Sequence, residues 1–401
     1  IAADVLARYK RMLGYDVFFL TGTDEHGQKV LHAAEENKKD PKEYVDLMVK
    51  HYKAAWKTLD ISFDDFIRTS EPRHEEVVQK IFKKLFETGD IYKGEYEGWY
   101  CIACETFWTE RELREDLEGR YLCPDCGRVT DKLKEETYFF KQSKWEKDLL
   151  NHIENNPDFI QPLSRRNEII SFIKTGLKDL SITRTAFPWG VQVPSDPRHV
   201  VYVWFDALIN YVTAPGYILD EEKFNHYWPA DVHLMGKEIV RFHAVTWPCM
   251  LLALGIPLPK KIFGHGWWTV EGEKMSKSKG NVVDPVTLAA EFGADSVRYF
   301  LMREVPFGMD GDFSKAALLH RYNADLANDL GNLLHRTLTM VEKYFEGVVP
   351  EPRNPSFDSL SKELIDLANK ISRDIDGCIE RLAFSDALIT IWELINKANN
   401  Y

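Results

Sequence analysis

The sequence predicts an α/β protein: a doubly wound parallel sheet interrupted by a small zinc-binding insertion, followed by an all-α helical bundle. Three observations support this prediction. Short apolar runs that end in polar turns alternate with helical stripes through residues 1–305, as in parallel sheets with crossover helices. Two Cys-x-x-Cys pairs stand in a segment of different character, residues 91–140. After Pro306 the apolar residues recur at helical spacing.

The composition is that of a large folded protein. The chain has 401 residues, of which 44% are hydrophobic and 28% charged, enough to build two or three cores. It shows no apolar run of membrane-spanning length and no charged-then-apolar leader, so we expect a cytoplasmic protein. The formal net charge of -12 argues against indiscriminate nucleic-acid binding. A local basic patch could still hold a nucleic acid.

Helical spacing also marks the start of the chain, at Val5, Leu6, Tyr9 and Leu13. Neither a capping residue nor a strand precedes this stretch. We therefore expect that the chain begins inside a helix and is truncated at its N-terminus.

The apolar run Val17–Leu20 predicts a buried strand that ends at the polar turn 21–27. Open α/β sheets bind ligands at the carboxyl ends of their strands. The carboxylate of Asp24 in this turn can pair with an α-ammonium group, or it can cap the helix that follows; the residues alone favour neither.

Two helical stripes follow, and we expect both to be core faces of helices that connect the sheet. The first comprises Tyr44, Leu47, Met48, His51, Tyr52, Ala55 and Trp56, and the second Val77, Val78, Ile81, Phe82, Leu85 and Phe86.

Four of the six cysteines form the two Cys-x-x-Cys pairs: Cys101, Cys104, Cys123 and Cys126. This spacing is typical of a tetrahedral zinc site built from two knuckles, and it fits iron–sulfur binding less well. Four thiolates leave no coordination position open, so we expect one structural zinc ion per chain. Cys249 and Cys378 lie in apolar helical surroundings and are predicted to be inert core thiols.

An aromatic helical face follows a predicted strand at 199–203 and comprises Trp204, Ala207, Leu208 and Tyr211. Spacing alone favours an ordinary aromatic core. Such a face also suits a flexible thioether, through sulfur–ring contacts of about 0.3–1.5 kcal/mol. After the next strand, 232–236, Ile239 and His243 share a helical face, and spacing alone favours a structural role for the histidine.

Three lysines and two serines lie within residues 274–279. The pair Asp284–Pro285 should then open a helix. Closely spaced ammonium groups on flexible stems can stabilise phosphate oxygens as a leaving pyrophosphate develops charge. The loop therefore indicates phosphoryl or adenylyl chemistry, although a random segment of this composition would be solvated surface.

The pentapeptide Lys274–Ser278 resembles the second signature of the class I aminoacyl-tRNA synthetases, and the longer stretch 263–278 resembles the methionyl-tRNA synthetases. The order of the other motifs agrees with this family, and the zinc insertion is similar to that of bacterial members with one zinc knob. The resemblance implies a Rossmann-like catalytic domain.

The resemblance also assigns roles to individual residues. Lys277, helped by Lys274, would contact the ATP phosphates as the catalytic pair. The implied ATP-binding residues are Gly236, Glu238, His265, Gly266 and Lys277. The implied methionine-binding residues are Asp24, at the substrate ammonium, and Trp204, Ala207, Leu208, Tyr211, Ile239 and His243. Leu208 departs mildly from the family, where many members have proline.

In the helical segment, Asn332 and Arg336 share one face. Their residue types fit a solvated face equally well, but they match the anticodon-contact asparagine and arginine of the family. An amide and a guanidinium suit hydrogen bonding to splayed-out bases. The Pro-Trp pair that follows in the family lies beyond Tyr401, so we expect truncation at this end too.

These observations predict a methionine-tRNA ligase that joins methionine to tRNA(Met) through a methionyl-adenylate, using ATP with Mg²⁺. The His-Ile-Gly-His signature of the family is absent from the sequence, which puts ATP activation by this chain alone in doubt. Two alternatives remain open: a cysteine-specific class I synthetase, which would need an open zinc position, and a non-catalytic tRNA-binding or assembly protein derived from a synthetase. No large editing domain is present, so a single pocket should select the amino acid.

The predicted domains are 1–90 and 141–305 for the two parts of the catalytic domain, 91–140 for the zinc-binding insertion and 306–401 for the anticodon-binding bundle. A monomer is expected, and a dimer if the protein has a further C-terminal domain.

Overall fold

The structure is a computed structural model of residues 1–401 and describes all of them except 104–105, 109, 117, 271, 276–279 and 352–357. For residues 96–97, 106–107, 111, 133–135 and 274 it describes the backbone alone. The chain divides into two compact units. The first comprises residues 1–17, 54–62 and 265–401, and the second residues 18–53 and 63–264. The three functional domains expected from the sequence, which occupy four ranges, are a different kind of division and stay a prediction.

Parallel strands in the second unit confirm the predicted α/β class. Strand β1 (Leu20–Thr23) pairs in parallel with β2 (Asp65–Arg68). Strand β14 (Ile262–His265) pairs in parallel with β8 (Ile160–Gln161) and has β13 (His233–Gly236) on its other side.

The first strand begins three residues later than the sequence predicts. Residues 17–19 are not in a strand. The backbone N–H of Phe19 donates to the Asp64 carboxylate at 2.6 Å, and the Phe19 carbonyl accepts from the Asp64 N–H at 2.8 Å. These bonds join Phe19 to the residue just before β2. The predicted strand Val17–Leu20 was therefore wrong in its bounds, since only Leu20 lies in β1.

Helices cover these strands and supply most of the core. They are α2 (Gln28–Glu36), α3 (Pro41–Thr58, which ends in the first unit), α4 (Pro72–Glu87), α5 (Glu146–Asn155), α6 (Leu163–Ile173), α7 (Val203–Leu208), α8 (Asn210–Thr213), α9 (Glu221–Tyr227) and α10 (Trp247–Leu254). The largest fully buried side chains of the core include Trp247, Phe82, Phe140, Phe159 and Phe205.

The two predicted core stripes differ in how deeply they are buried. On α4, Val77, Ile81 and Leu85 are fully buried, as predicted, although Phe86 is 45% exposed. On α3 the buried residues are Val45 and Val49. The predicted stripe is only half-buried, and its members His51 and Tyr52 are exposed. Both cysteines predicted to be core thiols, Cys249 and Cys378, are buried.

The cysteine-rich insertion is built on two long antiparallel strands, where the sequence predicts only short pieces. Strand β3 (Ile91–Cys101) pairs with β7 (Asp131–Phe140) over most of its length. Strands β4 (Thr106–Trp108) and β9 (Leu180–Ser181) flank this pair. Nearby, β12 (Asp196–Val201) lies between β10 (Thr183–Arg184) and β11 (Gln192–Val193).

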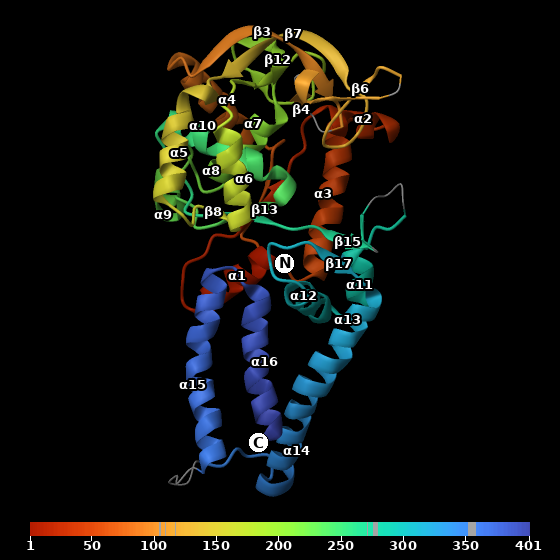
Figure 1. Ribbon diagram of the computed structural model, residues 1–401, viewed down its shortest axis with the longest axis vertical. Helices are drawn as coiled ribbons and strands as arrows, with labels where there is room; N and C mark the ends of the chain where they lie inside the picture. Colours follow the sequence, from red (N-terminus) through yellow and green to blue (C-terminus); the bar gives the residue numbers. More distant parts are fainter. Residues whose placement is uncertain (104–105, 109, 117, 271, 276–279, 352–357) are drawn as a thin grey trace. The chain divides into compact units, whose positions relative to one another are not determined.

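The first unit is mostly helical, as predicted for the C-terminal segment. Its helices are α1 (Ala2–Met12), α11 (Pro285–Phe292), α12 (Ala294–Arg303), α13 (Lys315–Arg321), α14 (Asn332–Phe345), α15 (Ser359–Glu380) and α16 (Phe384–Asn400). Helices α15 and α16 run side by side (Figure 1). Among the strands described here, β15 (Trp268–Val270) lies between β16 (Glu273–Lys274) and β17 (Gly311–Phe313). Asp284 caps α11, as the sequence predicts.

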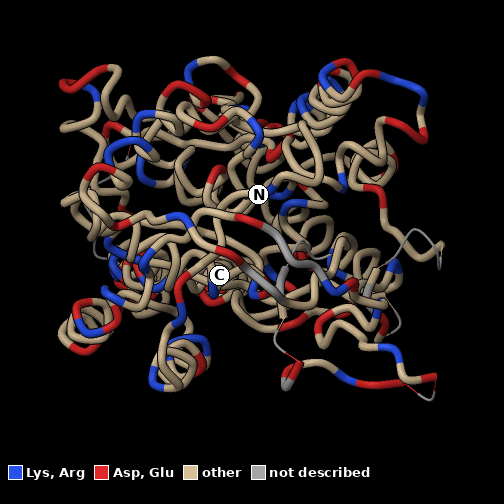
Figure 2. The backbone as a smooth tube through the Cα atoms, turned by 90° about the horizontal axis from the view of Figure 1, so that it is seen from above, with Lys and Arg blue, Asp and Glu red and all other residues tan. Residues whose placement is uncertain are grey.

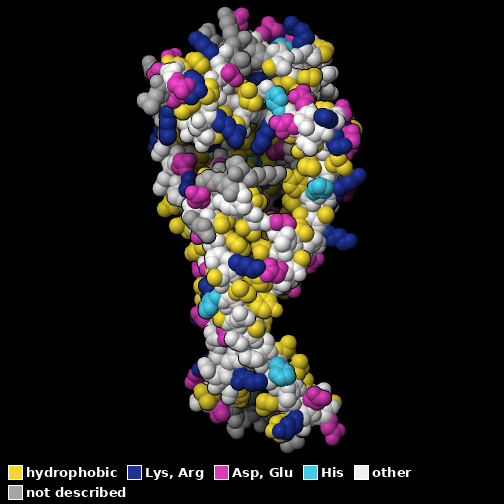
Figure 3. Space-filling view, turned by 90° about the vertical axis from the view of Figure 1, so that its right-hand side faces the viewer, with side chains coloured by type: hydrophobic (Ala, Val, Ile, Leu, Met, Phe, Trp, Pro, Cys, Tyr) yellow, Lys and Arg dark blue, Asp and Glu magenta, His cyan; other side chains and the backbone are white. Residues whose placement is uncertain are grey.

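The surface carries charges of both signs. Lys and Arg are interspersed with Asp and Glu along the backbone (Figure 2). Hydrophobic side chains also reach the surface of the helical part (Figure 3), among them Leu334, Leu338 and Tyr344 of α14. Within the described ranges, no helix combines the length and the apolarity needed to cross a membrane.

The burial on α4 gives a test of the core assignment. Leu85→Ala should lower the free energy of unfolding by about 2–5 kcal/mol, because the truncation leaves a cavity. Phe86→Ala, on the exposed side of the same helix, should change it by only about 0.5 kcal/mol. Denaturant unfolding followed by circular dichroism measures both variants. Equal losses would contradict the assigned face.

Candidate functional site

An aromatic wall forms where α7 meets the helical segment after β13. The ring of Trp204 stacks on Phe242, with centroids 4.2 Å apart and planes at 9° to each other. It meets the ring of His243 edge-on, with centroids 6.3 Å apart. Ala207 and Leu208 are buried on the same helix, whereas Trp204 is only half-buried. Part of the predicted face is therefore core, and the indole ring remains accessible.

A chain of hydrogen bonds fixes His243 beside this wall. The Tyr211 hydroxyl donates to His243 Nε2 at 2.8 Å, and His243 Nδ1 donates to the Ile239 carbonyl at 2.9 Å. Burial lowers the pKa of His243 to about 4. His243 is therefore neutral at pH 7, with its proton on Nδ1. It lies in a π-helical turn, Phe242–Thr246, a distortion that often occurs at functional sites.

A second neutral histidine lies behind Tyr211. The rings of Tyr211 and His233 are 4.3 Å apart, and Trp247 Nε1 donates to His233 Nε2 at 3.3 Å. Burial and the neighbouring His243 lower the pKa of His233 to about 3. The structure thus brings Trp204, Tyr211, Ile239 and His243 together, and the aromatic and imidazole rings among them are uncharged.

Asp24 follows β1 directly, at the carboxyl end of that strand. The residue is accessible to solvent, but the surrounding protein desolvates its carboxyl group. This desolvation and the negative charge of Asp206 raise the pKa of Asp24 to about 6. The raised pKa means that the protein destabilises the ionised form of Asp24. A cation next to the carboxylate would stabilise this form.

Sequence reasoning missed three buried ionisable residues next to Asp24. The Asp206 carboxylate is fully buried, with Oδ2 2.7 Å from His26 Nδ1 and Oδ1 2.8 Å from His74 Nε2. The one available signal was an aspartate inside the apolar run 203–209, because a charge on such a face needs a partner.

Gly236 and Glu238 lie together at the end of β13. A Cβ atom on Gly236 would lie 2.5 Å from Glu238 Oε2, so the carboxylate of Glu238 lies directly against the backbone at the end of the strand. Glu238 is exposed. Their contact with a ribose stays a prediction.

In the first unit, His265 and Gly266 have a tightly packed backbone. His265 Nδ1 donates to the Gly266 carbonyl at 2.8 Å, and the His265 ring stacks on Phe307 at 5.7 Å. A Cβ atom on Gly266 would lie 2.2 Å from the Met309 carbonyl oxygen. Gly266 is therefore required by the backbone of Met309, which lies close to it. Its expected contact with adenine stays a prediction.

The lysine loop is described only in part. Lys274 pairs with Thr269 in the ladder of β15 and β16, but its side chain lies outside the described atoms. Lys277 lies outside the described residues altogether. The catalytic roles expected for both lysines remain predictions.

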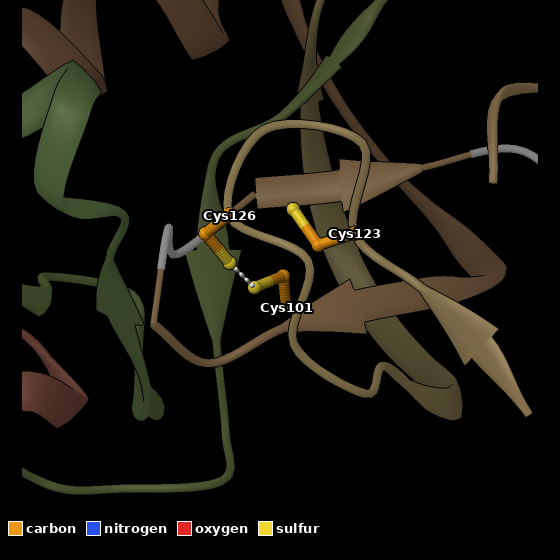
Figure 4. A group of neighbouring side chains, drawn as sticks. All are labelled: Cys101, Cys123 and Cys126. Atoms are coloured by element: carbon orange, nitrogen blue, oxygen red, sulfur yellow. Dashed lines mark hydrogen bonds between the residues drawn. The ribbon is translucent and has the colours of Figure 1, made fainter. Parts of the chain in front are cut away.

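Three of the four predicted zinc ligands lie close together (Figure 4). The sulfur atoms of Cys101, Cys123 and Cys126 all lie within 4.8 Å of one another, with 3.5 Å between Cys101 and Cys126. Cys101 and Cys123 are buried, and Cys126 is exposed. The fourth predicted ligand, Cys104, lies outside the described residues. Three converging thiol groups fit the donor preference of zinc.

A second group of possible metal ligands has a simpler explanation. Glu136, Asp196 and His199 converge, but the Lys93 ammonium bridges the two carboxylates at 2.8 and 2.9 Å. Hydrogen bonds from Arg198 and Lys93 lower the pKa of Asp196. This group is an ion-pair network that already contains its cations.

Asn332 and Arg336 line one polar hollow of about 590 Å³ on the helical part of the chain. The remaining lining residues are Asn328, Asp329, Asn396, Asn399 and Asn400. Asn399 Oδ1 accepts from Arg336 Nη2 at 2.5 Å. The predicted pair therefore faces a hollow rich in amide groups.

Comparison with known proteins identifies the family. The family model of the class I tRNA synthetases (M) matches residues 1–338. The chain belongs to the class I tRNA synthetases (M). Its sequence is 60% identical to the methionine-tRNA ligase of Caldanaerobacter subterraneus and 52% identical to that of Thermotoga maritima. Both alignments cover 100% of this chain, but only 62% and 63% of those proteins, so the chain spans less than two thirds of these relatives.

Solved structures of the same synthetase family agree. Mycobacterium tuberculosis methionyl-tRNA synthetase bound by methionyl-adenylate is 46% identical, with a TM-score of 0.96. The match covers 100% of this chain and 78% of that one. The free-state structure of the same protein matches with a TM-score of 0.86. The class I synthetase fold predicted from the sequence is confirmed.

The hydrogen bonds of His243 give a second test. Its imidazole should stay neutral between pH 5.5 and 8, because its pKa of about 4 lies below this range, and Nδ1 should carry the proton. Nitrogen-15 NMR of the histidine side chains reports both properties. Free histidine, which titrates near pH 6.5, is the control. A His243 signal that titrates within this range would contradict the assignment.

Proposed function

We propose that the protein is a methionine-tRNA ligase that works in the cytoplasm. It would activate methionine with ATP and then transfer the methionyl group to tRNA(Met). The observation that carries this proposal is the pairing, in one unit, of an accessible carboxylate at Asp24 with uncharged aromatic and imidazole rings. The names of the relatives, which are methionine-tRNA ligases, support it.

In the proposed pocket, the ammonium group and the thioether of methionine contact different residues. The Asp24 carboxylate pairs with the substrate ammonium, which supplies the missing cation. The thioether lies against Trp204, Tyr211 and His243, where polarisable sulfur gains contacts with rings. The further lining residues of the proposal are Ala207, Leu208 and Ile239.

The proposed activation step needs no general base, because the methionine carboxylate is itself the nucleophile. Its oxygen attacks the α-phosphorus of ATP, the bond to the β-phosphate oxygen breaks, and pyrophosphate leaves with the electron pair. Mg²⁺ bound to ATP neutralises phosphate charge. Lys274 and Lys277 would stabilise the charge that develops on the leaving group. Gly236, Glu238, His265 and Gly266 would hold the nucleoside.

The proposed zinc site is structural. Cys101, Cys104, Cys123 and Cys126 would hold one zinc ion, and a four-thiolate site leaves no position for substrate. The apolar packing of Cys101 and Cys123 against Trp108 supports this role.

The proposed tRNA contact lies in the helical part. Asn332 and Arg336 would hydrogen-bond anticodon bases within the polar hollow, since amide and guanidinium groups match base edges. The hydrogen bond that the Arg336 guanidinium donates to Asn399 Oδ1 supports a fixed orientation of the arginine side chain.

Methionine binding tests the proposal directly. In isothermal titration at pH 8, the protein should bind methionine in preference to leucine and cysteine. Asp24→Asn should weaken this binding by a factor of about 10 to 100, because the ammonium then loses a charged partner. ATP–pyrophosphate exchange with the full-length protein tests activation. If methionine does not bind while tRNA(Met) does, the protein is an adaptor.

Metal content tests the zinc site. The purified protein should contain one zinc ion per chain, and Cys123→Ser should lose it, because a hydroxyl is a poor substitute for a thiolate. Cys249→Ser, at a buried cysteine outside the cluster, should keep the zinc. Elemental analysis by mass spectrometry measures all three proteins. Full zinc content in the Cys123 variant would refute the assigned ligand set.

A further inference from the structure

The buried group around Asp206 joins three parts of the fold. Asp206 lies on α7, between Trp204 and Ala207. His26 lies two residues after Asp24, and His74 lies in the first turn of α4. One fully buried carboxylate therefore connects the end of β1, α4 and the helix that bears the aromatic wall.

Asp206 and His26 are joined by a hydrogen bond of 2.7 Å and shift each other's pKa. Burial alone would raise the pKa of Asp206, but the charge and hydrogen bonds of His26 and His74 keep it below its ordinary value. Burial alone would lower the pKa of His26, but the charge of Asp206 raises it overall. Each partner therefore favours the charged form of the other.

Further charged and aromatic groups lie next to the pair, and the negative charges of Glu75 and Glu25 also raise the pKa of His26. His26 Nε2 is 3.9 Å from the Glu75 carboxylate, and the His26 ring meets Trp189 edge-on. Glu25 is held by Arg68 at 2.7 and 3.0 Å.

Both members of the pair affect the pKa of Asp24. The negative charge of Asp206 raises the pKa of Asp24, and the charges of His74 and His26 lower it. A positive charge on His26 therefore opposes the effect that the Asp206 anion has on the pKa of Asp24. A protonated carboxyl group pairs poorly with an ammonium group.

We propose that His26 and Asp206 act together as positioning residues for amino-acid binding. The pair holds the end of β1 against α7, and its internal charge balance allows Asp24 to ionise opposite the substrate ammonium. This inference rests on the proposed function, because it assigns Asp24 to that ammonium.

The pH dependence of methionine affinity tests the pair. For the wild-type protein, affinity should fall below pH 6, by about tenfold per pH unit, because only ionised Asp24 pairs with the ammonium. His26→Asn keeps a donor near the position of Nδ1 but removes the positive charge. The pH at which methionine affinity falls to half of its maximum should therefore rise by about one pH unit; this pH is the midpoint. Its affinity should then be about fivefold weaker at pH 6 and nearly unchanged at pH 8.

The double variant His26→Asn/Asp206→Asn provides the decisive comparison. It removes both charges of the pair, so the midpoint should return to the wild-type value. Asp90→Asn is the matched control, since Asp90 is a buried carboxylate that pairs with Lys144 and Trp145. Its midpoint should equal that of the wild type.

The outcomes separate the two levels of the proposal. Equal weakening of the His26 variant at pH 6 and pH 8, or a double variant weaker than the single one at both values, would show a merely structural role and overturn the inference. A wild-type protein that binds no methionine would overturn the proposed function, and the inference with it. If the double variant does not fold, the pH 6 to pH 8 contrast of His26→Asn decides alone.

Discussion

The interaction on which the site depends is the fully buried carboxylate of Asp206 between two imidazoles. A charge removed from water is costly unless it is paired and hydrogen-bonded. Both oxygens of this carboxylate have a partner, and each partner comes from a different segment. The end of β1, α4 and α7 must therefore meet at one point. Asp24 and Trp204 each lie two residues from this point, so their local placement follows from the burial of a single charge.

Buried histidines in this unit have pKa values shifted in opposite directions, and their neighbours decide the direction. His233 and His243 are buried without a carboxylate, so burial lowers the pKa of both. His26 is also buried, but Asp206 raises its pKa. One part of the unit is thus lined by neutral rings, and another contains paired charges. An apolar thioether and an ammonium group have opposite requirements, and this division matches both.

Features that depend on local periodicity or spacing could be predicted from the sequence. The buried face of α4, the cap of α11 and the convergence of Cys101 with Cys123 and Cys126 belong to this class. The buried face of α3 was not predictable, since its aromatic stripe looked more apolar than the Val45 and Val49 face. Nor was the group around Asp206, because 180 residues separate it from His26 and 132 from His74. Neither histidine alone differs from an ordinary core histidine.

Two adjacent carboxylates after β1 show how the fold separates structural from functional charge. Glu25 is buried and accepts from Arg68, from Ser70 and from Thr23. Asp24, one residue earlier, has no hydrogen bond or ion pair among the described residues, and its pKa rises to about 6. A carboxylate already saturated by arginine has little to gain from another cation. Asp24 is desolvated but has no cation paired with it among the described residues, so under the proposed function the substrate ammonium would supply that interaction.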